Sequence, residues 1–93
     1  MSEIDFDDEV YWDASLLIFW AEHGKNRIKC VAGRETIAEL PGFTHASSKE
    51  ISVRKEEIRD ALRGAAIYKI TGGVFSDPER KTVTIYISDV AKA

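Results

Sequence analysis

The sequence has a single cysteine, Cys30, and only two histidines, two prolines and six glycines among its 93 residues. One cysteine excludes an internal disulfide framework, and so few soft ligands exclude a thiolate-rich zinc or iron–sulfur site. The low glycine and proline content, set against 44% hydrophobic residues, excludes collagen-like and low-complexity chains. We therefore expect one domain, residues 1–93, that folds on its own and uses no metal or cofactor.

Long apolar runs and a basic amino-terminal segment are also missing. The longest apolar run, residues 16–21, is far shorter than the roughly 20 residues that span a membrane. The first nine residues contain five acids and no base, which is not the pattern of a secretory signal. Together with the lone thiol, this predicts a cytoplasmic protein without a membrane partner.

The net charge of −3 is unevenly distributed along the chain. Residues 1–13 hold six of the sixteen acids and none of the thirteen bases, which leaves the other residues with ten acids against thirteen bases. The acidity therefore belongs to the amino terminus. We expect residues 1–13 to form an acidic arm or an edge strand.

Hydrophobic alternation predicts a small antiparallel sheet. Residues 16–21 and 26–32 are expected to form a hairpin with a four-residue loop, and residues 82–88 a further strand. In this register residue 21 pairs with residue 26. The inner face then holds Leu17, Phe19, Ile28 and Cys30, and the further strand adds Val83, Ile85 and Ile87.

Two helices are expected between the hairpin and the last strand. A short one covers residues 33–40 and ends at Pro41-Gly42; a long one runs from Ser48 or Ser52 to Ile70. Ser47 and Glu50 have the spacing of a capping box, and Gly72-Gly73 suits a left-handed helix end. The apolar sector of the long helix contains Ile51, Ile58, Leu62, Ala65 and Ala66. The predicted class is α+β, with two layers: a small antiparallel sheet packed on one long helix with a short side helix.

Several positions spread over nearly the whole chain carry a family resemblance. They are Ile4-x-Phe6, Tyr11-Trp12-Asp13, Ile18-Phe19, Ile28-x-Cys30, Glu35-x-Ile37, Arg54 with Ile58, Ala65-Ala66 with Lys69, and Asp89. In these positions the chain resembles a family of small bacterial proteins described only as a domain of unknown function. The resemblance implies a small α+β fold and a bacterial source, and it carries over no catalytic residue.

The residue types that perform catalysis do not occur in the required patterns. His23 and His45 lack metal-ligand spacing with each other or with Cys30. The predicted inward position of Cys30 favours a core residue over a nucleophile. Ser47 and Ser48 lack the glycine-flanked turn that exposes a nucleophilic serine. We expect a protein that is not an enzyme.

The outer sheet face is the first candidate site. Because only one long helix is available, one face of the sheet should lack a cover. The residues predicted there are Ile18, Trp20, Arg27, Lys29 and Tyr86, with Leu16 and Val31 as further members. The favoured cover is a second copy of the chain or the amino-terminal segment folding back, since its acids suit Arg27 and Lys29. The alternative is single-stranded nucleic acid, against which the net negative charge argues.

A basic stripe on the long helix is the second candidate surface. It consists of Lys55, Arg59 and Arg63, spaced four residues apart. It is a solvated face, or else a docking stripe for an acidic partner or for this protein's own amino terminus. The sequence as a whole predicts a non-catalytic interaction or regulatory module that self-associates through its sheet, with a protein partner or a nucleic-acid-binding module as the alternatives.

Overall fold

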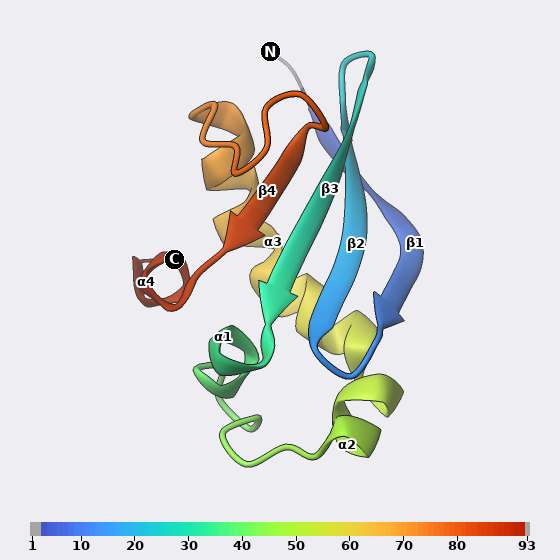
Figure 1. Cartoon of the computed structure of the whole chain (residues 1–93), viewed down its shortest axis with the longest axis vertical. Helices are drawn as coiled ribbons and strands as arrows, with labels where there is room; N and C mark the ends of the chain where they lie inside the picture. Colours follow the sequence, from blue (N-terminus) through green and yellow to red (C-terminus); the bar gives the residue numbers. More distant parts are fainter. Residues whose placement is uncertain (1–2, 93) are drawn as a thin grey trace.

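The computed structural model describes the backbone of residues 3–92. It contains strands β1 (Ile4–Trp12), β2 (Leu16–His23), β3 (Asn26–Gly33) and β4 (Thr82–Ile85), and helices α1 (Arg34–Ala38), α2 (Ser48–Val53), α3 (Lys55–Thr71) and α4 (Ile87–Lys92). The strands form one sheet in the order β1-β2-β3-β4, and α3 lies behind it (Figure 1). The predicted α+β class is confirmed.

The sheet is mixed, and the expectation of a wholly antiparallel sheet is wrong. β1, β2 and β3 pair antiparallel, whereas β4 lies parallel to β3. The segment between β3 and β4 contains α1, α2 and α3 and crosses behind the sheet. Such a crossover returns the chain to the end of the sheet where β3 began, so β4 must run in the same direction as β3.

The β2–β3 hairpin has a two-residue loop, Gly24 and Lys25, where a four-residue loop was predicted. His23 pairs with Asn26, so the register is shifted by two residues from the predicted one. Gly24 has φ +66°, and its positive φ at the first loop position suits a type II′ turn. Because side chains alternate with a period of two, a shift of two leaves each residue on its predicted face.

The acidic amino-terminal segment is an edge strand. β1 pairs with β2 from Ile4 opposite His23 to Trp12 opposite Leu17. The register shifts between Phe6 and Val10, so residues 7–9 form a bulge. Because the segment lies in the sheet, it does not fold over the outer face, and that predicted cover is wrong.

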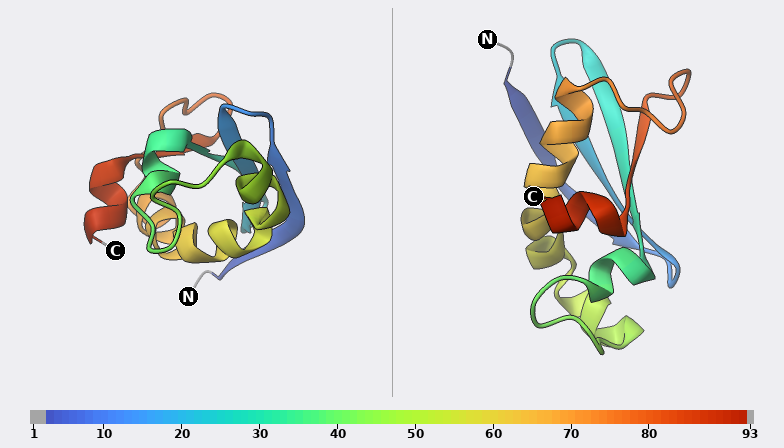
Figure 2. Two further views of the ribbon diagram at one scale, coloured as in Figure 1. Left: turned by 90° about the horizontal axis from the view of Figure 1, so that it is seen from below. Right: turned by 90° about the vertical axis from the view of Figure 1, so that its left-hand side faces the viewer.

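The core lies between the sheet and α3, which runs along one side of the sheet, while α1 and α2 lie beyond the lower ends of the strands (Figure 1 and Figure 2). The predicted inner residues of the hairpin are buried, as is the apolar sector of the long helix. Those fully or nearly fully buried are Leu17, Phe19, Ile28, Cys30, Ile51, Ile58, Leu62, Ala65, Ala66, Val83 and Ile85. A large apolar side chain such as Leu, Ile or Phe contributes roughly 1.5–3 kcal/mol when it leaves water.

The long helix is divided at Arg54, whose φ of −106° and ψ of 21° leave the helical region. α2 therefore ends at Val53 and α3 begins at Lys55. The predicted cap is confirmed, since Ser47 Oγ accepts a hydrogen bond from the Glu50 backbone N–H at 3.2 Å. The left-handed end is also confirmed, with φ +69° at Gly73.

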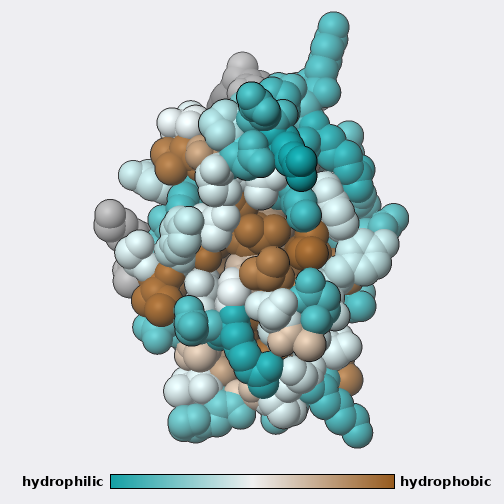
Figure 3. Space-filling view, viewed as in Figure 1, coloured by the Kyte–Doolittle hydropathy of each residue, from teal (hydrophilic) through white to brown (hydrophobic). Residues whose placement is uncertain are grey.

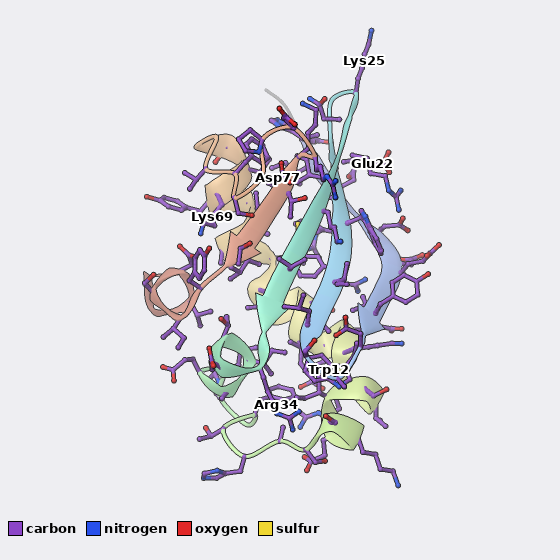
Figure 4. The ribbon with its side chains drawn as sticks, viewed as in Figure 1. Trp12, Glu22, Lys25, Arg34, Lys69 and Asp77 are labelled. Carbon is purple, nitrogen blue, oxygen red and sulfur yellow. The ribbon has the colours of Figure 1, made fainter. Side chains whose placement is uncertain are left out.

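The last strand ends at Ile85, earlier than predicted, and α4 follows. Asp89 Oδ2 accepts hydrogen bonds from the Tyr86 backbone N–H and from Lys69 Nζ, each at 2.7 Å. These bonds cap α4 and tie it to α3; Figure 4 shows Lys69 beside β4. Ile87 lies in α4 and is 43% exposed, so its predicted inward position is wrong. Within residues 3–92, no helix has the length and apolar character needed to cross a membrane.

Candidate interaction face

The side of the sheet opposite α3, here called the open face, has no helix over it among the described residues (Figure 2). Strand alternation determines its members. They are Asp5 and Tyr11 from β1, Leu16, Ile18, Trp20 and Glu22 from β2, Arg27, Lys29 and Val31 from β3, and Thr82 and Thr84 from β4. Four of the five predicted surface residues therefore share this face.

The centre of the open face is apolar. Ile18 pairs with Val31 across β2 and β3, and Leu16 lies on the same face of β2. In Figure 3 hydrophobic residues gather in the middle of this face, with polar residues around them. Val31 is only 9% exposed, but Leu16 is 37% exposed, so the patch is open to solvent on the β2 side.

Trp20 has partners within the chain on two sides. The Tyr11 ring meets it edge-on at 5.5 Å between centroids, and the Arg27 guanidinium lies over the indole at 5.3 Å. Arg27 also reaches across β2 to Asp7 in the bulge, with 3.0 Å between Nη2 and Oδ2. Partial burial raises the pKa of Asp7, but the hydrogen bond and charge of Arg27 outweigh it and hold that pKa below its usual value.

Lys29 and Glu9 have no ion pair among the described residues, and neither do Asp5 and Glu22, which lie on the same face nearer the hairpin loop. Lys29 on β3 is exposed and pairs in register with Trp20 on β2. Glu9, in the bulge of β1, is exposed and accepts a hydrogen bond from the Tyr11 hydroxyl. That bond to a carboxylate raises the pKa of Tyr11. The β1 side of the face is therefore acidic and the β3 side basic.

Tyr86 is not part of the open face, which corrects its predicted place beside Trp20. β4 has ended before it, and its ring lies 4.6 Å from Lys69 Nζ, on the α3 side. The alternation of residues 82–88 predicts a strand that continues past Tyr86, and it carries no information about the contact of Asp89 with Lys69 on α3.

The basic stripe of α3 contacts β1. Arg59 Nη1 donates hydrogen bonds to the backbone carbonyls of Asp7 at 3.0 Å and Asp8 at 3.3 Å. Arg63 lies over the Phe6 ring at 5.1 Å, and Lys55 is half-buried. Arg59 and Arg63 therefore bind this protein's own amino-terminal segment, which was one of the alternatives for the stripe. The sequence did not predict the bulge at residues 7–9, whose backbone carbonyls accept the hydrogen bonds.

The groups that were weighed for catalysis are dispersed. Cys30 is fully buried, and burial raises the pKa of its thiol to about 12. His23 lies at the end of β2, while His45 lies in the loop before α2. Among the described residues, no three His, Cys, Asp or Glu side chains group so as to hold a metal ion.

The open face thus combines an apolar centre with an acidic and a basic side. No protein-family model, curated protein or solved structure matches this chain.

Proposed function

We propose that the protein is a non-catalytic interaction or regulatory module that self-associates through the open face. One observation carries the proposal: among the described residues, the exposed Leu16 and the half-buried Ile18, next to Val31, form an apolar centre on the side of the sheet that no helix covers. Contiguous apolar surface with a polar rim is typical of protein interfaces. The family resemblance and the lone thiol support a bacterial, cytoplasmic setting, which stays a prediction.

The size of the face favours a weak dimer. With a rise of about 3.3 Å per residue and about 4.8 Å between strands, the sheet covers on the order of 400 Å². Burying this area on each of two copies gives less than the roughly 1,200 Å² of a stable interface. We therefore expect association in the micromolar range.

Nucleic acid receives less support from the geometry. A base needs a free aromatic ring, but Tyr11 and Arg27 already occupy two sides of Trp20. Arg27 is itself paired with Asp7, and Tyr86 lies elsewhere. Lys29 remains as a cation for phosphate, beside the acids of β1, and one cation gives little affinity.

Sedimentation velocity over about 1–500 µM tests the proposal. The wild type should pass from monomer to dimer, whereas Ile18→Glu should stay monomeric because dimerisation would bury a charge. Val53→Glu is the matched control: Val53 is 76% exposed on α2, away from the open face, and this variant should dimerise normally. Leu16→Glu, at the start of β2, is the second variant if Ile18→Glu fails to fold.

A wild type that remains monomeric over this range would overturn the proposal. Binding of a short labelled single strand, with affinity falling steeply as salt rises, would instead support the nucleic-acid alternative. Equal weakening by Val53→Glu and Ile18→Glu would also contradict an interface on the open face.

A further inference from the structure

We propose that two copies pair face to face about a two-fold axis that runs parallel to the strands over β2, so that Lys29 of each copy meets Glu9 of the other. This inference rests on the proposed self-association through the open face. It adds the symmetry of the pair and the residues that determine that symmetry.

Glu9 and Lys29 lie at the same position along the strands. Lys29 pairs in register with Trp20, and Trp20 lies between Phe19, which pairs with Val10, and Ala21, which pairs with Phe6. Glu9 belongs to the bulge between those two β1 positions. Glu9, Trp20 and Lys29 therefore lie at one height, on three adjacent strands.

Glu9 and Lys29 also lie on opposite sides of β2. β1 and β3 flank β2 on opposite sides. A two-fold axis along the strands over β2 places β1 of one copy against β3 of the other and keeps the height unchanged. Glu9 and Lys29 then meet twice, once on each side of the axis, as an isologous interface requires. Each residue is exposed and without an ion pair among the described residues of its own chain, so neither must break a salt bridge to do this.

A two-fold axis that runs across the strands is disfavoured by the same charges. A two-fold axis across the strands would place β1 against β1, with its acids opposite one another, and β3 against β3, with Lys29 on the cationic side of both copies. Like charges placed opposite each other at an interface disfavour association. The axis along the strands is the arrangement that makes the acidic and basic sides complementary.

The apolar contacts agree with this axis. β2 lies over the partner's β2, so Ile18 and Trp20 meet their own copies near the axis, at the usual sheet separation of about 10 Å. Glu22, also on β2, would approach its copy at the hairpin end. Because aligned sheets cross at about 30°, the hairpin ends of the two copies diverge. The contact is therefore centred near Ile18 and Trp20, away from Glu22.

Charge reversal tests the pairing. Sedimentation equilibrium would give the dimer dissociation constants of the wild type, Lys29→Glu, Glu9→Lys and the double variant. Each single variant faces two like-charge contacts, so its dissociation constant should rise about tenfold. The double variant restores both opposite-charge contacts and should return to within about threefold of the wild type.

A mixture of the two single variants gives the sharpest result. In the mixed dimer, one copy carries glutamate at both positions and the other carries lysine at both, so both contacts join opposite charges. The heterodimer should therefore form more tightly than the homodimer of either variant. Lys25→Glu at the hairpin tip and Glu39→Lys after α1 reproduce the charge changes outside the face, and should leave the dissociation constant unchanged.

The outcomes separate the inference from the proposed function. In one outcome, the wild type dimerises while Lys29→Glu and Glu9→Lys raise the dissociation constant no more than the control variants do. That result would overturn the pairing of Glu9 with Lys29 and leave the proposed function standing. Tighter association of Glu9→Gln, which removes the Glu9 charge from both copies, would indicate an axis across the strands, since the axis along the strands predicts weaker association. A monomeric wild type would overturn both.

Discussion

At the scale of single residues, the buried thiol of Cys30 makes stability depend on pH. Burial raises its pKa from the ordinary 9.0 to about 12 in the folded chain. Below pH 9 the thiol is protonated in the folded and unfolded states. Above pH 9 the unfolded thiol ionises while the folded one does not, so the free energy of unfolding falls until the pH passes the folded pKa.

This predicts a steeper alkaline loss of stability in the wild type than in Cys30→Ala. The difference in slope should be about 1.4 kcal/mol per pH unit above pH 9. Denaturant unfolding of both proteins from about pH 8 to about pH 10.5 measures it. Cys30→Ala also loses packing contacts, but this loss is the same at every pH. Only the slope of the unfolding free energy against pH therefore reports the ionisation of the thiol. Parallel slopes would show that the thiol ionises without unfolding.

At the scale of elements, Arg59 joins α3 to the bulge of β1. Its side chain is only 14% exposed, and it holds the carbonyls of Asp7 and Asp8. A hydrogen bond from a charged donor contributes roughly 1.5–3 kcal/mol to the free energy of unfolding, and a buried carbonyl left without a hydrogen-bond donor lowers stability further. The helix therefore stabilises an edge strand whose register is irregular.

Arg59→Gln should lower the free energy of unfolding by about 1–3 kcal/mol and speed amide hydrogen exchange within β1. Lys55→Gln is the matched control from the same stripe, because Lys55 has no ion pair among the described residues; it should change stability by less than about 0.5 kcal/mol. Amide hydrogen exchange measured by NMR over residues 4–12 tests whether Arg59 stabilises β1. Unchanged exchange in Arg59→Gln would mean that β1 pairing alone holds the bulge.

At the scale of the whole molecule, β1 closes the sheet beside β2. Deletion of residues 1–12 would expose the β2 edge and uncover the core beside Val10 and Phe6. Unpaired edges with apolar side chains associate with other chains. We therefore expect the shortened chain to unfold with low cooperativity and to aggregate, as measured by light scattering and thermal unfolding.

The control for this deletion removes charge but keeps the strand. Asp5→Asn with Asp8→Asn should remain folded and dispersed, since both residues are exposed and β1 still pairs with β2. If the doubly neutral variant aggregates like the shortened chain, the acidity of β1 rather than its pairing is what matters.

Local patterns predicted the face of each hairpin residue, although they missed the loop length. Leu17 and Phe19 point inward and Trp20 outward in either register, because the two registers differ by two residues. The Ser47 cap and the Gly73 helix end were equally predictable, since each depends on residues within one helical turn.

Contacts between distant residues account for what was missed. Asp89 pairs with Lys69, twenty residues earlier in the chain, and this pair holds α4 against α3, with Tyr86 off the predicted face and Ile87 exposed. Arg27 reaches across β2 to Asp7 and occupies one side of Trp20. Neither contact joins residues at a spacing from which the sequence could predict it.

The sequence by itself determined the buried face of the hairpin and of the long helix, the cap at Ser47 and the helix end at Gly73, and that the acidity lies at the amino terminus. These features depend on periodicity and on neighbours within a few residues. Only the tertiary structure decided that this acidic segment is a bulged edge strand held by Arg59, and that β4 is parallel to β3. It also decided that an acidic and a basic side of the open face lie across β2, because strand order is a property of the whole fold.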